Sequence, residues 1–383
     1  MRQIGSTALV HRPRLALFAL LLAGSASMES AIAEVDERFE RWDRDGDGRL
    51  VRDEVPEGLR GNFDRVDRNQ DGVIDLQEHL AAVGRGRVPN PPMAESVRVV
   101  DDVAYGGDGN PRRRLALAVP RRSTIEGPLP VVVCIHGGGW QSGDHRSTLD
   151  RSIGIAATGR YAVASIGYRL SEEAIWPAQL EDCQAALRWI HDHADRLGFD
   201  RDRIAVLGRS AGGHLAAMLA VRSKPPVRIR AAVDYFGPTD LLAMQAQDPE
   251  GVMIDHDAAD SPESRLMGGP VQSRPGRARD ASPINFVDAG DPPILVIHGR
   301  RDRLVPFQQS VEFVKALRDA GGPVTFLPVE TGGHGGFRDP SIDAAVRAFL
   351  EHHLHDAGAP PQGVDPAKAL GPQEVRSPEG SKP

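Results

Sequence analysis

Short apolar runs recur along the later part of the chain, and helix-forming stretches lie between them. Each run is bounded by Gly, Pro or polar residues and is too short for a helix, so it predicts a buried strand. The runs span residues 131–135, 203–207, 231–235, 293–297 and 324–329. Residues 179–187 and 214–220 are instead rich in Ala, Leu and other helix formers. This alternation predicts an α/β domain with a largely parallel sheet between layers of helices.

The run 203–207 leads into a glycine-rich motif around a serine. Residues 208–212 read Gly-Arg-Ser-Ala-Gly and directly precede the predicted helix 214–220. At such a strand-to-helix junction the serine sits on a strained turn where neighbouring side chains would collide, so the flanking positions need glycine. We therefore predict that Ser210 is a nucleophile at the end of a strand.

Three consecutive glycines, residues 137–139, follow His136 at the end of the run 131–135. Glycines leave the backbone N–H groups bare and approachable, as the stabilisation of a tetrahedral oxyanion requires. The predicted donors are the N–H groups of Gly138, Gly139 and Ala211. A flexible turn is the alternative interpretation, although a plain turn has no need of such a run after a core strand.

Two aspartates are candidates for the acid that would act together with the serine and a histidine. Asp302 lies just beyond the run 293–297, where the sites of open parallel sheets gather. Asp240 is the rival, but residues 238–241 are also typical of a helix start with an Asp cap. His334 follows the last apolar run, and its flanking glycines permit a tight loop. We favour Asp302 as the acid that orients His334.

The order serine, acid, histidine along a chain is expected of an α/β-hydrolase sheet. Residues 97–354 resemble the esterase/lipase side of that superfamily, and within it the secreted carbohydrate-esterase-like group that includes feruloyl and acetylxylan esterases. The segments that carry the likeness are 136–140, 176–182, 208–215, 261–269 and 298–306. The resemblance implies an eight-stranded, mostly parallel sheet with helices on both faces.

The same resemblance implies a serine carboxylesterase. Ser210, activated by His334, would form an acyl-enzyme that water then hydrolyses, and catalysis would need no metal. Small-molecule or carbohydrate esters, acetylated or feruloylated ones among them, are the expected substrates. A peptidase or amidase of the same superfamily shares most of these motifs and stays open as an alternative.

Two acidic segments of twelve residues, 43–54 and 67–78, share one spacing of oxygen-bearing residues with glycine at the sixth position. They resemble EF-hand loops, in which several carboxylates converge on one calcium ion. The predicted ligands are Asp43, Asp45, Asp47, Glu54 and the carbonyl of Arg49 in the first loop, and Asp67, Asn69, Asp71, Asp75, Glu78 and the carbonyl of Val73 in the second. Val51, at the ninth position, offers no side-chain oxygen, so the first site is the weaker candidate.

Only residues 55–66 separate the two loops, too few for two full helices, so a compact α-helical EF-hand pair is expected. Extracellular calcium would keep even weak sites filled, so the ion is expected to stabilise rather than to regulate. A calcium sensor, a dockerin-like module and a non-catalytic calcium-dependent binding protein are the alternatives.

The N-terminus has the features of an export signal. Basic residues precede the apolar run 15–23, and Ala31-Ile32-Ala33 offers small residues for cleavage. We expect a secreted or periplasmic protein with no stable membrane span after cleavage. The expected divisions are a signal peptide at 1–33, the EF-hand pair at 34–84, a linker at 85–96, the catalytic domain at 97–355 and a disordered tail at 356–383.

The formal net charge of −7 comes largely from the acidic excess in residues 34–84. Basic patches with interleaved aromatic residues are missing from the sequence, so nucleic acid is not an expected partner. Cys134 and Cys183 fall in a predicted strand and a predicted helix and are interpreted as buried free thiols. The sequence predicts neither a monomer nor an oligomer.

The segment 244–282 is long for a connection between two strands and is expected to form part of the substrate pocket as a partial lid. Trp140 and Trp176 either stack on a sugar or aromatic ring of the substrate or pack in the interior. His298 ends a predicted strand and is interpreted as a structural hydrogen-bonding residue.

Overall fold

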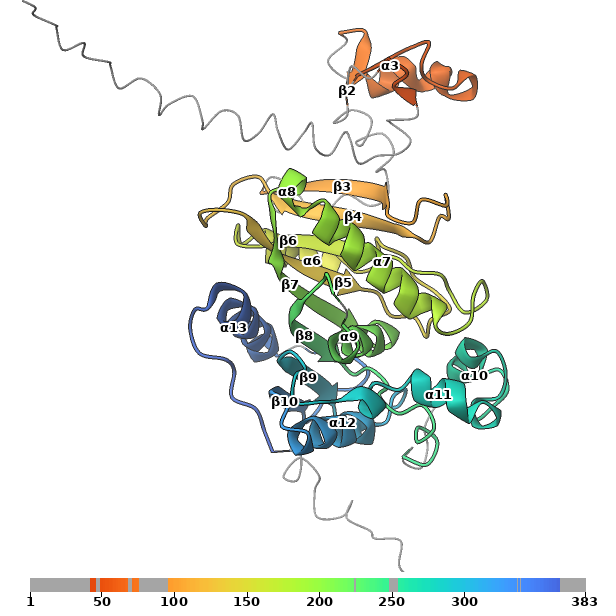
Figure 1. Cartoon of the computed structure of the whole chain (residues 1–383), viewed down its shortest axis with the longest axis vertical. Coiled ribbons are helices and arrows are strands. Elements are labelled where there is room, and N and C mark those ends of the chain that lie inside the picture. The colour runs from red at the N-terminus through yellow and green to blue at the C-terminus, as the bar shows by residue number, and fades with distance from the viewer. Residues whose placement is uncertain are drawn as a thin grey trace, which may run out of the picture.

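The computed structural model describes residues 42–45, 49–67, 71–75, 96–223, 225–247, 254–335, 337 and 339–365. From residue 96 onward the chain forms one sheet of eight strands with helices on both faces (Figure 1). The strands are β3 (Val97–Ala104), β4 (Arg114–Pro120), β5 (Leu129–Ile135), β6 (Ala162–Ile166), β7 (Phe199–Arg209), β8 (Ile229–Tyr235), β9 (Ile294–Gly299) and β10 (Val324–Val329). Their order across the sheet is β10-β9-β8-β7-β5-β6-β4-β3. The predicted α/β-hydrolase architecture is confirmed.

The six neighbouring strands from β10 to β6 are parallel, and at the other edge β4 pairs antiparallel with both β6 and β3. Strand β5 lies near the centre, where Val133 pairs with Ala164 of β6 and with Val206 of β7. All seven residues of β5 are buried. A parallel strand covered by helices on both faces needs apolar side chains at every position, which explains the continuous apolar runs of the sequence.

Five longer helices cover the two faces. On one face, α7 (Ala178–Asp192), α9 (Ala211–Val221) and α12 (Phe307–Asp319) share a hydrophobic core with the sheet. On the other, α6 (Leu149–Ala156) and α13 (Pro340–His355) form a second core. Cys134 and Cys183 are free and buried, one in each core. Within the described residues, no helix combines the length and the apolar character needed to cross a membrane.

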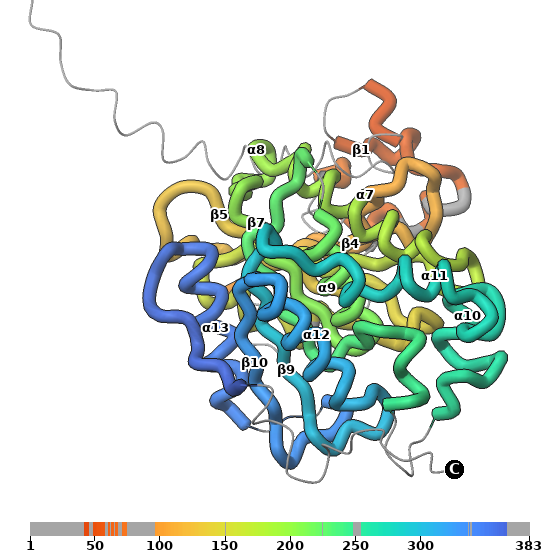
Figure 2. The backbone as a smooth tube through the Cα atoms, turned by 60° about the horizontal axis from the view of Figure 1, so that its bottom comes forward, coloured from red at the N-terminus to blue at the C-terminus, as the bar shows by residue number. Residues whose placement is uncertain are grey.

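The connection between β8 and β9 contains α10 (Pro262–Met267) and α11 (Pro275–Asp280), with short 3-10 turns at Val271–Ser273 and Pro283–Phe286. Figures 1 and 2 both place α10 and α11 together at one side of the molecule. Within the expected lid segment 244–282, residues 254–282 thus form short helices and turns outside the sheet.

The N-terminal unit has a small sheet of its own. Strand β1 (Arg49–Val51) pairs antiparallel with β2 (Val73–Asp75), and Leu50 lies opposite Ile74. The linking segment holds a 3-10 helix (Glu57–Asn62) and the short α3 (Phe63–Val66). These abbreviated helices agree with the compact linker expected between the loops.

Most of the segments expected at the two ends of the chain lie outside the described residues. The signal peptide 1–33, most of the linker 85–96 and residues 366–383 lie outside the described residues. Residues 356–365 differ from the disorder expected of the tail, because the N–H of Val364 donates to the carbonyl of Phe326 in β10 at 2.8 Å. Arg318 also donates to the carbonyl of Val364 at 3.1 Å, which holds this segment beside α12.

Candidate active site

Ser210 occupies the sharp turn between β7 and α9. Its backbone φ is +55°, a strained conformation for a residue with a side chain. A Cβ placed on Gly208 would lie 1.9 Å from the carbonyl oxygen of Gly212, and one on Gly212 would lie 2.2 Å from that of Ile135. The two glycines of the motif therefore allow β7, α9 and β5 to approach closely enough to present the serine.

The structure brings Ser210, His334 and Asp302 into one hydrogen-bonded chain. Nε2 of His334 lies 2.9 Å from Oγ of Ser210, and its Nδ1 lies 2.7 Å from Oδ2 of Asp302. Because an ionised carboxylate can only accept, the ring proton is on Nδ1, and Nε2 accepts from the serine hydroxyl. This is the tautomer in which an imidazole can remove the serine proton.

Asp302 is 3% exposed, and its carboxylate accepts hydrogen bonds from four N–H groups. Its Oδ1 accepts from the backbone N–H groups of Leu304 at 2.8 Å and Val305 at 3.0 Å. Its Oδ2 faces His334 and, at 3.2 Å, Nε2 of His298. Burial alone would raise the pKa of Asp302, but the hydrogen bonds from His298 and His334 outweigh burial and hold that pKa well below its usual range. The carboxylate therefore stays ionised beside His334.

His298 is the site residue whose role the sequence did not reveal. Its Nε2 also lies 3.1 Å from the carbonyl of Val305, and its Nδ1 lies 2.7 Å from Oγ of Ser310. Both neighbours of Nε2 are acceptors, so Nε2 carries the proton and Nδ1 accepts from the serine hydroxyl. His298 is thus more than a structural residue, because it donates to the acid that orients His334.

Asp240, the rival acid, has other contacts. Its Oδ1 accepts from the N–H of Leu242 at 3.1 Å, and its own N–H donates to Oε1 of Gln309 at 2.8 Å. These are the contacts of a local turn, and residues 241–247 form turns rather than the helix that the alternative interpretation of residues 238–241 expected. Among the described residues, the acid that reaches His334 is Asp302.

The predicted oxyanion donors line the same cavity as Ser210 and His334. Gly138 and Gly139 have φ angles of +105° and +58°. A Cβ on Gly138 would lie 2.4 Å from the carbonyl oxygen of Ser142, so only glycine fits there. Gly138, Gly139 and Ala211 all contribute to the wall of this cavity, which has a volume of about 900 Å³.

Contacts between His136 and Tyr168 fix the loop that carries these glycines. The ring of His136 stacks on Tyr168 with centroids 4.1 Å apart, and the hydroxyl of Tyr168 donates to the carbonyl of His136 at 2.9 Å. Burial lowers the pKa of His136 to about 4, so the ring is neutral at pH 7. The loop is therefore fixed before a substrate arrives, as oxyanion stabilisation requires.

Trp140 and Trp176 pack in the interior, which decides between the two roles left open for them. They are 1% and 2% exposed. The indole N–H of Trp140 donates to Nδ1 of His214 at 3.2 Å, and that of Trp176 donates to Oδ2 of Asp280 at 2.7 Å. Rings this deeply buried cannot stack on a sugar without a rearrangement.

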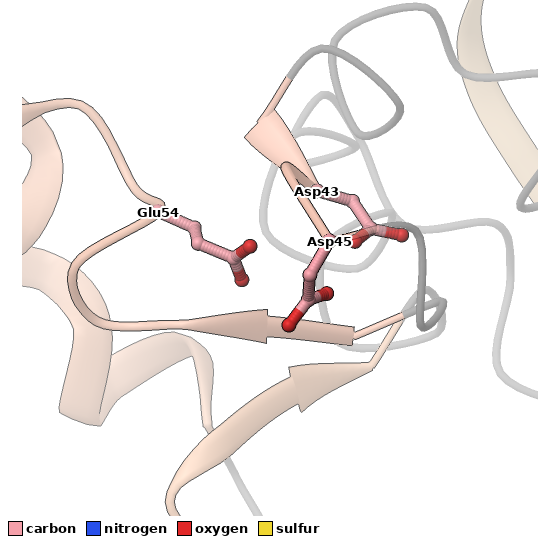
Figure 3. A group of neighbouring side chains, drawn as sticks. All are labelled: Asp43, Asp45 and Glu54. Atoms are coloured by element: carbon pink, nitrogen blue, oxygen red, sulfur yellow. The ribbon is translucent and has the colours of Figure 1, made fainter.

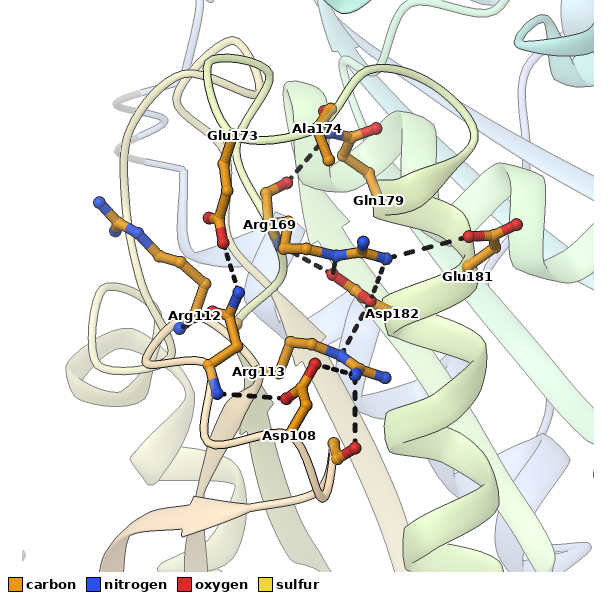
Figure 4. Close-up of polar contacts among 12 residues, drawn as sticks. Asp108, Arg112, Arg113, Arg169, Glu173, Ala174, Gln179, Glu181 and Asp182 are labelled. Carbon is orange, nitrogen blue, oxygen red and sulfur yellow. Dashed lines mark hydrogen bonds and ion pairs between the residues drawn. The ribbon is translucent and has the colours of Figure 1, made fainter.

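A buried cluster of ion pairs holds residues 169–174, a segment that contributes to the cavity wall (Figure 4). Asp182 of α7 is fully buried and makes a two-point contact with Arg169 at 2.8 Å for both pairs of atoms. Nε of Arg113 lies 3.0 Å from the same carboxylate. Gln179 donates to the carbonyls of Arg169 and Ala174 at 3.0 and 2.6 Å. The cluster fixes residues 169–174, of which Glu172 reaches the cavity wall.

The lid segment also reaches the cavity, through Ile254, Pro262 and Glu263. An ideal Cβ on Gly139 would lie 3.4 Å from Cβ of Pro262, so the start of α10 lies directly beside the glycine loop. The expectation that residues 244–282 contribute to the substrate pocket agrees with this geometry.

In the first EF-hand-like loop, Asp43, Asp45 and Glu54 point toward one another (Figure 3). Each offers a carboxylate oxygen within 4.8 Å of those of the other two. The carboxylate of Glu54 also accepts from the N–H groups of Arg44 and Val51 at 2.9 and 3.0 Å, which closes the loop on itself. Three converging carboxylates fit the oxygen ligands that calcium prefers.

In the second loop, Asp67 is 5% exposed, and its Oδ2 accepts from the N–H of Gly72 at 3.0 Å. Its Oδ1 is buried without a hydrogen-bond partner among the described residues. A buried carboxylate oxygen without a partner is costly, and a cation would satisfy it. The other predicted ligands Arg49, Asp71, Val73 and Asp75 belong to the described parts of the loops, whereas Asp47, Asn69 and Glu78 lie outside the described residues.

Comparison with known proteins places the sheet domain in a family. The BD-FAE family model matches residues 117–317. The probable carboxylic ester hydrolase LipM of Mycobacterium tuberculosis is 31% identical over 70% of this chain and 65% of its own length. Esterase LipI of the same organism is 32% identical over 69% of this chain and 81% of its own length. The chain spans about three fifths of the first curated relatives that it matches.

Among solved structures, a truncated form of a carbohydrate esterase from gut microbiota is similar to this chain. The two are 29% identical, with a TM-score of 0.62, and the match covers 70% of this chain and 100% of the other.

Proposed function

The chain belongs to the BD-FAE family of α/β-hydrolases, and on that premise we propose that it is a serine carboxylesterase. The observation that carries the proposal is the hydrogen-bonded chain from Ser210 through His334 to Asp302. The esterases among its relatives support the same activity.

The proposed reaction has two halves. Oγ of Ser210 attacks the ester carbonyl while Nε2 of His334 takes its proton, and the proton then passes to the departing alcohol. Water attacks the acyl-enzyme with the same histidine as base, which releases the acid and restores the serine. Asp302 holds the imidazole in the required tautomer and stabilises the imidazolium as it forms. The N–H groups of the glycine loop and of Ala211 are the proposed donors to each oxyanion.

A short activated ester tests this reaction directly. We expect the purified chain to hydrolyse p-nitrophenyl acetate and a fluorophosphonate to label Ser210. The Ser210→Ala variant should lose both properties, with a reduction in kcat of at least about 10⁴-fold, while its melting temperature stays within a few degrees of the parent. Hydrolysis that survives in Ser210→Ala would overturn the proposed nucleophile.

We further propose that the substrate is a carbohydrate ester, either acetylated or feruloylated. Its support is the similarity to the gut carbohydrate esterase and a cavity of about 900 Å³, within the size range of ligand pockets. A panel of acetylated and feruloylated oligosaccharides beside simple alkyl esters and p-nitroanilides tests it. A preference for anilides would favour the amidase alternative.

For the N-terminal unit we propose two calcium sites that stabilise the protein. The support is the convergence of Asp43, Asp45 and Glu54 and the unpartnered oxygen of Asp67. The pairing of β1 with β2 adds to it, because it sets the eighth residues of the two loops, Leu50 and Ile74, opposite each other. Calcium would supply charge neutralisation to these carboxylates and take no part in ester hydrolysis.

The last part of the proposal is export, with the signal peptide removed after Ala33. Its support is the basic start, the apolar run 15–23 and the small residues before Glu34. N-terminal sequencing of the protein from the culture medium or periplasm should begin at Glu34. Intact protein found only in the cytoplasm would contradict it.

A further inference from the structure

Three arginines lie at one part of the active-site cavity, and the proposed chemistry uses none of them. Arg151 belongs to α6, and Arg209 is the last residue of β7, directly before Ser210. Both line the cavity that contains the serine. They also line a second cavity, of about 210 Å³, whose wall includes Arg347 of α13. The active-site cavity and this side cavity therefore share a positively charged part of their walls.

The charges of these arginines are not neutralised by the protein. Among the described residues, no carboxylate forms an ion pair with any of the three. Elsewhere on α13, by contrast, Glu351 pairs with Arg160 at 2.7 Å. The side cavity has one acid in its wall, Asp343, so three arginines stand against one aspartate. The positive excess is local, because the chain as a whole carries a net charge of −7.

Arg209 is both fixed in place and accessible. Its guanidinium carbon lies 3.8 Å from the centroid of the Tyr235 ring, a cation–π contact with a residue that is 2% exposed. Arg209 itself is partly exposed and Arg151 is exposed, so a ligand in the cavity can reach both side chains. A charge that is positioned before binding costs less conformational entropy when a ligand meets it.

We propose that Arg151 and Arg209 bind a carboxylate group of the ester substrate. The inference rests on the esterase function proposed above and adds a negative charge, which an acetylated or feruloylated sugar does not need to carry. Arginine presents its N–H donors in a planar fork that matches the two oxygens of a carboxylate. A group with a single negative charge suits the site, because Asp343 offsets part of the positive charge in the side cavity.

The distance between the nucleophile and the proposed anion site is short. Arg209 and Ser210 are neighbours in the chain, so their Cα atoms lie about 3.8 Å apart. A substrate whose ester carbon is at Oγ of Ser210 therefore needs only a few carbon atoms between that carbon and its carboxylate to reach the guanidinium. An amide of the same shape fills the same space without the charge, which isolates the effect of charge in an experiment.

The experiment uses two pairs of esters, each pairing a carboxylate with the amide of the same shape. Monoethyl glutarate and ethyl glutaramate carry the group on the acyl part, and their hydrolysis releases ethanol. The γ-acetoxy derivatives of butyrate and butyramide carry it on the alcohol part, and their hydrolysis releases acetate. The quantity measured in each pair is the ratio of kcat/KM for the carboxylate to that for the amide. The concentration of active enzyme cancels in this ratio.

In at least one pair we expect a ratio of about five or more in the parent protein, since hydrogen bonds to charged groups are the stronger ones. The pair that shows it identifies the part of the substrate that carries the carboxylate. Arg151→Gln and Arg209→Gln should each lower the ratio, and the double variant should bring it to about one or below. Arg209→Lys keeps the charge but lacks the fork, and should be intermediate.

The control is Arg188→Gln, which removes the same charge from an exposed position of α7. This helix packs on the opposite face of the sheet from α6 and α13. The control should leave the ratio as it is in the parent, because salt screens exposed charges that are far apart.

A ratio near or below one in both pairs, or one that neither Arg151→Gln nor Arg209→Gln changes, overturns the inference and leaves the esterase function standing. An equal fall in Arg188→Gln also overturns it, because the effect would then come from net charge alone. If none of the four esters is hydrolysed while a fluorophosphonate labels Ser210, the inference alone fails. If Ser210 is not labelled either, the esterase function fails with it.

Discussion

Nε2 of His298 lies 3.2 Å from Oδ2 of Asp302, so the acid of the proposed triad holds two imidazoles at a single oxygen. His334 binds that oxygen from the substrate side, at 2.7 Å, and His298 binds it from the interior. The second histidine is fully buried, and its tautomer is set by the two acceptors at Nε2, Oδ2 of Asp302 and the carbonyl of Val305. The orientation of His334 therefore depends on a residue that never meets the substrate.

His298→Phe tests this positioning role. Phenylalanine keeps a ring between Phe236 and Phe307, which both contact His298, but it removes the donor to Asp302. We expect kcat to fall by roughly tenfold with little change in KM. Because the lost donor raises the pKa of Asp302, the acidic limb of the pH profile of kcat/KM should also move to higher pH. An unchanged pH profile with only a lower melting temperature would reduce His298 to a packing residue.

Asp234 gives the fold a pH dependence of known sign. The residue is fully buried, and its Oδ1 accepts from the N–H of Gly237 at 2.9 Å. Burial raises its pKa from 3.8 to about 7. The folded state therefore holds its proton more tightly than the unfolded chain, and the resulting stability is present below about pH 4 and lost as pH rises through 7.

Asp234→Asn removes this titration. Between pH 5 and pH 8 its free energy of unfolding, measured with urea, should rise relative to the parent by roughly 2–3 kcal/mol. Asp202→Asn, a matched change at an exposed site, should leave the difference between the two pH values as it is in the parent. A variant of Asp234 that follows the parent at every pH would show that this carboxyl has an ordinary pKa.

The nucleophile turn can be tested through its glycine. A Cβ on Gly208 would lie 1.9 Å from the backbone oxygen of Gly212, so Gly208→Ala must move β7 or α9. We expect it to destabilise the protein by about 3 kcal/mol or more and to abolish hydrolysis.

Gly154 offers the matched control, because a Cβ there meets nothing within 4 Å and the residue lies in α6. Gly154→Ala should be neutral or stabilise by up to about 1 kcal/mol. Urea unfolding and the rate with p-nitrophenyl acetate measure both effects. Comparable behaviour of the two variants would mean that the close approach at Gly208 is not required.

Removal of calcium should separate stability from catalysis. A chelator should lower the melting temperature, since a ligand present at a hundred times its Kd contributes about 3 kcal/mol, while the rate at 25 °C changes by less than about twofold. Asp67→Asn should reproduce the loss, because Asp67 offers a buried oxygen without a partner.

Asp64→Asn is the control for that variant, because Asp64 is 83% exposed and pairs with Arg52 outside the predicted ligand set. Loss of activity on chelation at an unchanged melting temperature would favour a calcium sensor over passive stabilisation.

Local sequence was sufficient for those parts of the site whose geometry is local. Ser210 and Gly138 were predicted from short motifs, because a strained turn and a positive φ leave few residue types possible at those positions. The choice of Asp302 over Asp240 was harder, since both follow an apolar run and only the folded loops decide which one meets His334.

Other features depended on contacts between distant segments. Trp140 and Trp176 have the same local appearance whether they stack on a ligand or pack in the core, and only their burial separates the two roles. The role of His298 lies in its contact with an oxygen of Asp302, which its position at the end of a predicted strand does not reveal.

The sequence by itself determined five of the eight strands, the nucleophile turn and the order of serine, acid and histidine, because hydrophobic runs and glycine requirements are properties of short segments. Only the tertiary structure decided which buried groups satisfy one another. Hydrogen bonds such as those between Asp302 and the rings of His298 and His334 join residues that become neighbours only when the sheet has formed, and no local pattern encodes that distance.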